Sequence, residues 1–211
     1  MEPVTTEHPG RWTRRKSERP GEILDAALRV FSEKGFAAAR MEDIAKVAGV
    51  TKGTIYLYFE NKESVFKNLI LDLVGDMLGA VEMQMIAYRG PVRDLLTFVL
   101  KNVALVLVQS DRVALPKIII AEAGNFPELA EFYKREAIDR GMGMLGSLMQ
   151  RGIDRGEFRA LPTDHMVRLL IAPMLLSAVW RSTFAQFDAE PFDYQAFIDT
   201  HLDVFLRGVL P

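Results

Sequence analysis

Side chains able to contact nucleic acid are concentrated in one short stretch of the chain, "VTKGTIYLYF", residues 50–59. Lys52 carries a positive charge, Thr54 a hydroxyl and a methyl group, and Tyr56 a phenol. An ammonium group neutralises phosphate, whereas hydroxyl, methyl and phenol groups can contact base edges or phosphate oxygens. The stretch therefore has the chemistry to bind DNA if its local structure directs these side chains outward.

The local structure predicted for this stretch is a short helix. Alternating apolar and aromatic residues are typical of a β-strand, but the segments on both sides have helical spacing. Thr51 follows a glycine-valine pair and can cap a helix, because its hydroxyl can accept a hydrogen bond from a free amide of the next turn. Helical spacing then places Ile55, Tyr58 and Phe59 near one face of the helix. The side chains that fall mostly on its other faces are Lys52, Thr54, Tyr56 and Leu57. Only part of the stretch can belong to a core.

Two predicted helices precede this stretch. Residues 22–34, "EILDAALRVFSEK", follow Pro20 and Gly21 and carry an apolar stripe, and Gly35 fits the position just past a helix end. Residues 40–49, "RMEDIAKVAG", predict a helix of about two turns that ends at Gly49. Two short helices joined by a tight turn with glycine form the unit whose second helix enters the DNA major groove.

The segment from Gly35 to Phe66, "GFAAARMEDIAKVAGVTKGTIYLYFENKESVF", resembles the TetR-type (TetR/AcrR) transcriptional regulators. A glycine-aromatic turn, the core pattern IA..AGV(S/T)KGT(I/L)Y.(Y/H)F..K and a lysine that opens the next helix occur in order. The resemblance implies an all-α fold of about nine helices. Residues 20–66 would form a helix-turn-helix domain, and a long fourth helix would join it to an effector-binding and dimerisation domain, residues 67–211.

The resemblance also implies a set of DNA-binding residues. Lys62 would grip the DNA backbone beside the Tyr58 hydroxyl, and Gly53 would let the backbone approach closely. Many relatives have Ser or Thr where this chain has Arg40, so Arg40 either replaces a helix cap or touches DNA. The full predicted set is Arg40, Thr51, Lys52, Gly53, Thr54, Tyr56, Leu57, Tyr58 and Lys62. Without the match to the motif, these tyrosines would ordinarily be interpreted as packing residues and these lysines as solvated charges.

Charge is distributed unevenly along the chain. Residues 11–62 hold eleven Lys and Arg against seven Asp and Glu, whereas residues 63–211 hold fifteen against nineteen. A basic N-terminal part ahead of an acidic remainder favours nucleic acid as a partner. Residues 1–19 include the cluster "RWTRRKSER" and predict a flexible basic arm. The arm would add phosphate or minor-groove contacts, or serve only as a solubilising tail.

Other classes of protein are disfavoured. The chain has no cysteine, its three histidines are scattered, and no Glu-x-x-His pair or glycine-rich phosphate loop occurs, so neither a helical metal oxidase nor a cofactor is expected. A protein-binding helical adaptor would not need Lys52, Thr54, Tyr56 and Lys62 in this register. The longest uncharged apolar run, residues 169–180, is too short to span a bilayer. We therefore expect a cytoplasmic protein with no membrane partner.

The C-terminal part predicts long helices with more than one buried face. An apolar stripe from the region of Lys62 continues for about 28 residues, roughly 40 Å; the helix either transmits a signal to the DNA-reading end or is only structural. Further helices are predicted at residues 92–108, 116–123 and 127–154, the last interrupted at "RGMGMLG". Residues 163–186 are apolar almost all round and, with residues 193–209, favour a dimer.

An effector cavity is expected from the resemblance, and its candidate lining consists of large apolar residues: Met77, Met85, Phe98, Phe126, Met174, Trp180 and Phe184. Ordinary core packing is the alternative for each of them. The sequence and the resemblance together predict a homodimer that binds a palindromic operator in double-stranded DNA, acting as a repressor released by a small lipophilic effector or as a ligand-dependent activator.

Overall fold

The computed structural model describes residues 11–106 and 113–211, with side chains from residue 19 onward except those of residues 76 and 77. Every regular element among these residues is a helix, which confirms the all-α prediction. The chain divides into two compact units, Met1–Asn68 and Leu69–Pro211. Each unit is described by itself.

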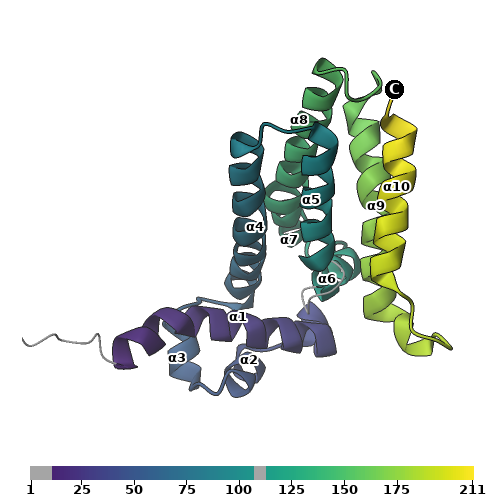
Figure 1. The fold of residues 1–211 in the computed structure, drawn as a ribbon. Helices are drawn as coiled ribbons and strands as arrows, with labels where there is room; N and C mark the ends of the chain where they lie inside the picture. Colours follow the sequence, from purple (N-terminus) through teal and green to yellow (C-terminus); the bar gives the residue numbers. More distant parts are fainter. Residues whose placement is uncertain (1–10, 107–112) are drawn as a thin grey trace, which may run out of the picture. The chain divides into compact units, whose positions relative to one another are not determined.

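The first unit contains α1 (Arg11–Ala38), α2 (Met41–Val47), α3 (Lys52–Tyr56) and the start of α4 (Lys62–Ala87) (Figure 1). The backbone of α1 is helical from Arg11, so the prediction of a helix that starts after Pro20 and Gly21 was wrong. Pro20 lies inside α1, where it costs one hydrogen bond to the preceding turn without ending the helix.

Two glycines break the helical path of the first unit: Gly35 kinks α1, which continues to Ala38, and Gly49 follows the end of α2 as predicted. Gly35 has φ 76° and Gly49 has φ 66°, a left-handed backbone that glycine adopts without a steric penalty. After Gly49 the chain turns sharply, and the Val50 amide donates to the Ala45 carbonyl at 2.9 Å. This turn sets the direction in which α3 leaves α2.

Three phenylalanines form the centre of the first unit. Phe31, Phe36 and Phe66 have ring centroids 5.2–5.5 Å apart and are almost fully buried. Tilted and edge-to-face rings at this spacing add to the stability provided by burial itself. The trio therefore joins the two parts of α1 on either side of Gly35 to the first turns of α4.

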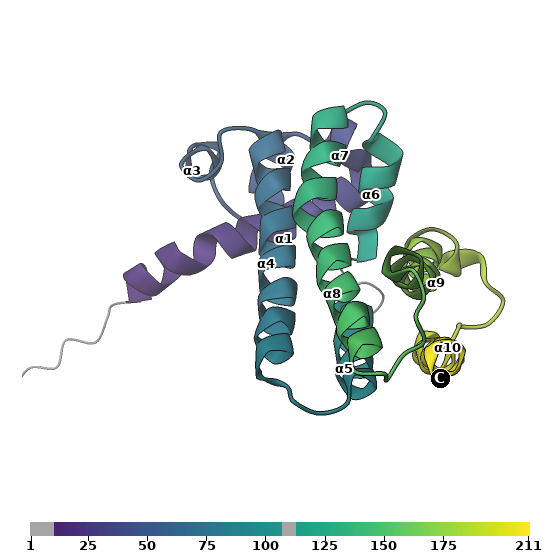
Figure 2. The ribbon, with the colours of Figure 1, turned by 90° about the horizontal axis from the view of Figure 1, so that it is seen from above.

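The second unit contains the rest of α4 and the helices that follow it (Figure 2). Their bounds are α5 (Val92–Ala104), α6 (Ala114–Glu122), α7 (Pro127–Tyr133), a π-helix η3 (Lys134–Asp139), α8 (Arg140–Asp154), α9 (Thr163–Thr183), a 3-10 turn η4 (Ala185–Phe187) and α10 (Tyr194–Val209). The long helix predicted from residue 127 to 154 is interrupted at η3 and not at "RGMGMLG". The glycines of α8 remain helical because its apolar face packs into the core, with Leu148 and Met149 fully buried.

One hydrophobic core holds α5, α8, α9 and α10 together. Buried residues from each of these helices join it, among them Leu96, Leu148, Leu170 and Leu202. Gly152 of α8 faces the ring of Phe158 so closely that an added Cβ would overlap it. A larger residue at position 152 would therefore force the Phe158 ring to shift.

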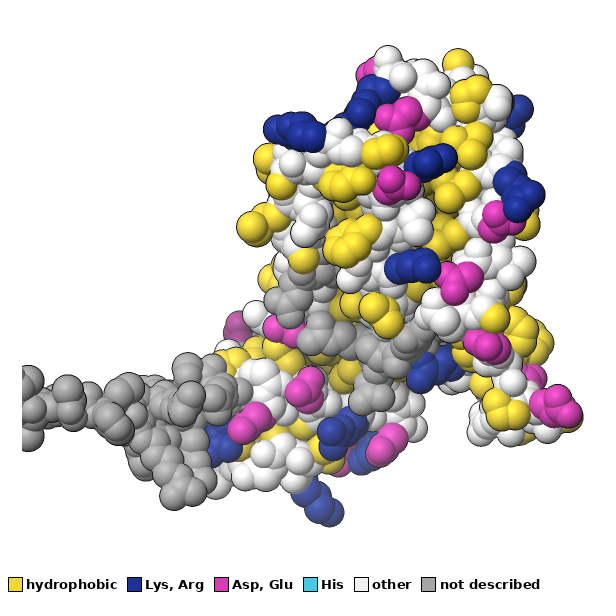
Figure 3. Space-filling view, in the orientation of Figure 1, with side chains coloured by type: hydrophobic (Ala, Val, Ile, Leu, Met, Phe, Trp, Pro, Cys, Tyr) yellow, Lys and Arg dark blue, Asp and Glu magenta, His cyan; other side chains and the backbone are white. Residues whose placement is uncertain are grey.

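Helix α9 is buried on one side only in the single chain. Its length and apolar composition would allow it to cross a membrane, but a core helix of a soluble protein passes the same test. Met174 is fully buried, whereas Leu169 and Leu176 are 67% and 64% exposed. Figure 3 shows hydrophobic side chains at the surface of this unit. The helix thus contributes one face to the core and leaves another uncovered.

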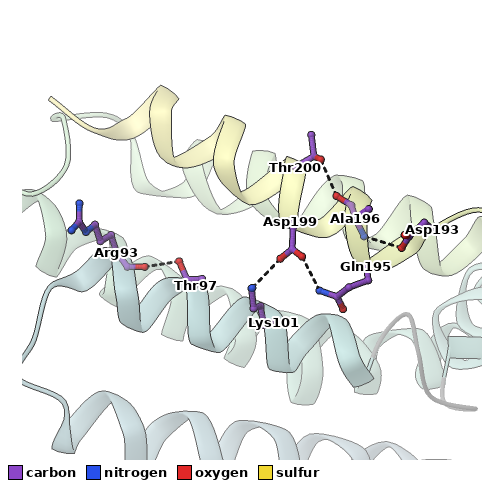
Figure 4. A network of polar contacts seen from close by, with 8 residues as sticks. All are labelled: Arg93, Thr97, Lys101, Asp193, Gln195, Ala196, Asp199 and Thr200. Carbon is purple, nitrogen blue, oxygen red and sulfur yellow. Dashed lines mark hydrogen bonds and ion pairs between the residues drawn. The ribbon is translucent and has the colours of Figure 1, made fainter.

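Helices α5 and α10 are also joined by polar contacts (Figure 4). Lys101 of α5 forms an ion pair with Asp199 of α10 at 2.9 Å, and Gln195 donates to the same carboxylate at 3.2 Å. The hydrogen bond from Lys101 lowers the pKa of Asp199. The Lys101–Asp199 pair links the two helices, whereas Gln195 lies on the same helix as Asp199, and at an exposed site these contacts contribute little stability.

Candidate nucleic-acid interface

Helix α3 is held in place by a cap at its start and two buried side chains. The Thr54 amide donates to Thr51 Oγ1 at 3.1 Å, and the two threonine hydroxyl oxygens lie 2.8 Å apart. Ile55 is fully buried and Phe59 is 5% exposed. The predicted cap at Thr51 and the predicted burial of Ile55 and Phe59 are confirmed, but α3 ends at Tyr56, so Phe59 lies just past the helix.

The outer face of α3 carries the side chains that the sequence singled out. Lys52, Gly53 and Tyr56 are exposed, Thr54 is half-buried, and Leu57 just past the helix is 83% exposed. Tyr58 is half-buried, so part of it packs and part of it meets solvent. A rigidly capped helix with polar and apolar groups directed outward is the arrangement that reads base edges in a major groove.

Lys52 has an internal partner that the sequence analysis missed. Its ammonium lies 2.6 Å from Glu42 Oε1 on the first turn of α2. The hydrogen bond from Lys52 lowers the pKa of Glu42, and the same contact raises the pKa of Lys52. Both side chains are exposed. Part of the positive charge at the start of α3 is therefore balanced by a carboxylate of α2.

Arg40 does not cap α2 with its side chain. Its backbone is extended, with φ −125° and ψ 153°, and its amide donates to the Asp43 carboxylate at 3.3 Å. Asp43 also pairs with Lys34 at 2.8 Å. The side chain of Asp43 thus supplies the polar contact at this helix start, and the exposed Arg40 guanidinium is left on the surface.

Lys62 lies at the start of α4 as predicted, but its ammonium points into the first unit. It donates to the carbonyls of Phe36 and Ala37 at 2.9 Å each and of Ala39 at 3.3 Å. The ammonium also lies 4.7 Å from the centre of the Phe36 ring. Within the unit the ammonium of Lys62 thus binds backbone carbonyls, and the DNA contact expected for Lys62 stays a prediction.

The seven candidate effector residues differ widely in their surroundings. Met174 belongs to the core of the second unit, and Met85 packs against that core. Trp180 and Phe184 have ring centroids 5.1 Å apart and are nearly half exposed, as is Phe98. Phe126 is half-buried, and the side chain of Met77 lies outside the described residues. Their role in effector binding remains a prediction.

A surface hollow of about 410 Å³ in the second unit contains none of these seven residues. Arg89, Arg93 and Arg155 line it together with Glu157. Glu157 pairs with Arg155 at 3.1 Å and accepts a hydrogen bond from the Val92 amide at the start of α5. Arg93 pairs with Asp94 at 3.4 Å. These contacts balance most of the charge of the arginines within the chain.

Taken together, the Gly49 turn, the capped α3 and its exposed side chains define a helix-turn-helix DNA-binding protein. Two family models match the chain. Residues 23–69 match bacterial regulatory proteins of the tetR family, and residues 86–192 match the tetracyclin repressor-like C-terminal domain. The chain belongs to the TetR family of transcriptional regulators.

Individual relatives agree with this assignment. The chain is 27% identical over 197 residues to the fatty acid metabolism regulator protein of Bacillus subtilis (strain 168), over 92% of this chain and 98% of that protein. It is 31% identical over 161 residues to the HTH-type transcriptional regulator YfiR of the same organism, over 74% of this chain and 72% of that protein. The structure of FadR from Bacillus subtilis in complex with stearoyl-CoA has a similar fold, with a TM-score of 0.71 and 22% identity over 89% of this chain and 98% of that one.

Proposed function

We propose that the chain is a cytoplasmic homodimeric repressor, without enzymatic activity, that releases its operator when a lipophilic effector binds. The observation that carries the proposal is α3 itself, because Ile55 anchors it while Lys52 and Tyr56 stand exposed. The proposed DNA contacts are Arg40, Thr51, Lys52, Gly53, Thr54, Tyr56, Leu57, Tyr58 and Lys62. Family membership favours this function over that of an adaptor that binds only protein.

The dimer is proposed to form through α9 and α10. Leu169 and Leu176 of α9 and Val204 of α10 are each more than 60% exposed in the single chain. Exposed aliphatic side chains along two neighbouring helices are typical of a surface that another subunit covers. Two recognition helices related by a two-fold axis would then reach half-sites about 34–36 Å apart. Sedimentation of the free protein as a monomer at micromolar concentration would argue against the proposed dimer.

The effector is proposed to be a molecule with a long acyl chain. The chain aligns over nearly its whole length with a fatty acid metabolism regulator, and a relative of similar fold was solved with stearoyl-CoA. The second unit supplies apolar residues such as Met85 and Met174. Thioether side chains are adaptable and suit an apolar site that holds an acyl chain.

The effector proposal is tested on the operator complex. DNA fragments that the protein binds would first be selected from the source genome. Stearoyl-CoA is then titrated into the complex of protein and operator while fluorescence anisotropy is followed, with coenzyme A lacking the acyl chain as the control. We expect release by stearoyl-CoA and none by the control. A complex that persists at saturating stearoyl-CoA would rule out this effector class.

A further inference from the structure

The excess of positive charge in residues 11–62 lies entirely in residues 11–19, the basic segment. This segment holds five Lys and Arg against one Glu, a net charge of +4. Residues 20–62, the helix-turn-helix body, hold six Lys and Arg against six Asp and Glu, a net charge of zero. The body that carries α2 and α3 therefore has no excess of positive charge with which to attract a polyanion.

Ion pairs inside the body further reduce the charge that it can offer to DNA. Lys34 of α1 lies 2.8 Å from Asp43, and Lys52 of α3 lies 2.6 Å from Glu42. Both carboxylates belong to the first turn of α2. DNA affinity depends largely on the number of phosphates that the protein neutralises. A strong electrostatic attraction to DNA then depends on cations outside the body.

The basic segment forms the first turns of α1, whose backbone is helical from Arg11 and continues through Pro20. Figures 1 and 2 show these turns extending beyond the short helices of the first unit, on the side of α3 rather than of α2. Among the described side chains of α1, burial begins only at Ile23, and Arg19 forms an exposed ion pair with Glu22 at 3.0 Å. The segment thus precedes the part of α1 that packs into the core.

The spacing of these charges suits a DNA strand. A helix rises about 1.5 Å per residue, so the nine residues of the segment carry their net charge within about 14 Å. One strand of DNA presents about four phosphates over the same length. The helical backbone therefore concentrates the charge at a density close to that of the phosphates.

We propose that the basic segment binds the phosphate backbone of DNA beside the site read by α3 and supplies most of the electrostatic part of DNA affinity. The inference rests on the proposed function, because α3 brings the first unit to the operator. Arg and Lys bind phosphate through their charge, and phosphate contacts carry no base information. The segment therefore raises affinity for every DNA sequence alike, and α3 selects among sequences.

The test removes four cations of the segment in one variant: Arg11→Gln, Arg14→Gln, Arg15→Gln and Lys16→Gln. Glutamine keeps a high helix propensity without the charge. Anisotropy titrations with operator and with scrambled DNA at several salt concentrations give the slope of log affinity against log salt. We expect a slope shallower by at least about two per chain and an affinity at least about tenfold weaker at moderate salt for both DNAs. The ratio of the two affinities should stay that of the wild type.

A matched control removes the same charge from the second unit. It replaces four exposed cations by glutamine: Arg93, Lys134, Arg135 and Arg140. The two variants then have equal net charge, and the control should keep the wild-type slope. A chain shortened to begin at Glu18 lacks the same four cations of the segment but keeps the core from Ile23 onward. It should show the same loss as the quadruple variant.

Three results would overturn the proposal. The first is a wild-type slope in both the quadruple variant and the shortened chain. The second is an equal loss in the control, which would assign the effect to net charge. The third is a loss confined to the operator, which indicates base reading in the minor groove. If the wild-type chain binds operator and scrambled DNA equally, the proposed function fails, and the slopes on scrambled DNA still judge the basic segment.

Discussion

The ion pair between Lys52 and Glu42 places a negative charge on the surface proposed to meet DNA. The two groups are 2.6 Å apart and both are exposed. Because the pKa of Glu42 is lowered, the pair is present at neutral pH and is lost only as the pH falls through a value below 4.5. DNA phosphate must therefore compete with Glu42 for the ammonium of Lys52.

Glu42→Gln is expected to strengthen DNA binding without changing the fold. Freeing Lys52 should raise affinity by about two- to fivefold, the range of an exposed ion pair, and should steepen the salt dependence. Because phosphate contacts carry no base information, specific and non-specific DNA should gain alike. Anisotropy titrations with operator and with scrambled DNA measure both gains. Glu33→Gln removes a like charge from an exposed position of α1 and serves as the control. An equal gain in affinity in that variant would show that the gain comes from net charge and not from the Lys52–Glu42 pair.

Residues governed by local rules were predictable from the sequence, and those that depend on distant partners were not. The Thr51 cap and the left-handed glycines at positions 35 and 49 follow from nearest neighbours along the chain, and the structure confirms them. The acceptors of Lys62 lie 23 to 26 residues away, at the end of α1 and just after it, and come within reach only in the folded unit. The partner of Lys52 likewise lies on another helix. The motif identified these lysines but not what their ammonium groups contact.

At the scale of single elements, α8 shows how packing overrides local preference. Its glycines disfavour a helix by about 1 kcal/mol each relative to alanine, and the sequence accordingly predicted an interruption there. The structure instead places the irregular turn in η3, ahead of the glycines. Burial of the apolar face of α8 outweighs the glycines, and a single sequence does not reveal that burial.

Gly152 and Gly146 of α8 should respond in opposite ways to substitution by alanine. A Cβ at Gly152 would overlap the Phe158 ring, so Gly152→Ala should lower the free energy of unfolding by about 1–3 kcal/mol. A Cβ at Gly146 meets nothing within 4 Å, so Gly146→Ala should raise it by about 0.5–1 kcal/mol. Urea denaturation of the two variants checks the pair. Equal stability of both would mean that the Gly152–Phe158 contact is looser than described.

At the scale of the whole molecule, the two compact units correspond to the basic and the acidic parts of the sequence. The basic part of the sequence forms the unit with the helix-turn-helix, and the acidic remainder forms the larger helical unit that matches the C-terminal domain of the family. Fold class and family were predictable because the motif is long and the helical periods are strong. The effector site was not predictable, because the burial of each candidate residue depends on which helices pack around it in the folded chain.

The most direct test of the central claim, that α3 reads DNA, is an anisotropy titration of operator DNA with the wild-type chain and with Tyr56→Ala. Tyr56 is 43% exposed, so its truncation should leave the helical circular dichroism unchanged. We expect the wild-type chain to prefer operator over scrambled DNA with an affinity that falls steeply with salt, and Tyr56→Ala to bind at least about tenfold more weakly. Equal affinity of the two proteins for the operator, or a wild-type affinity that is flat between low and moderate salt, would contradict the account.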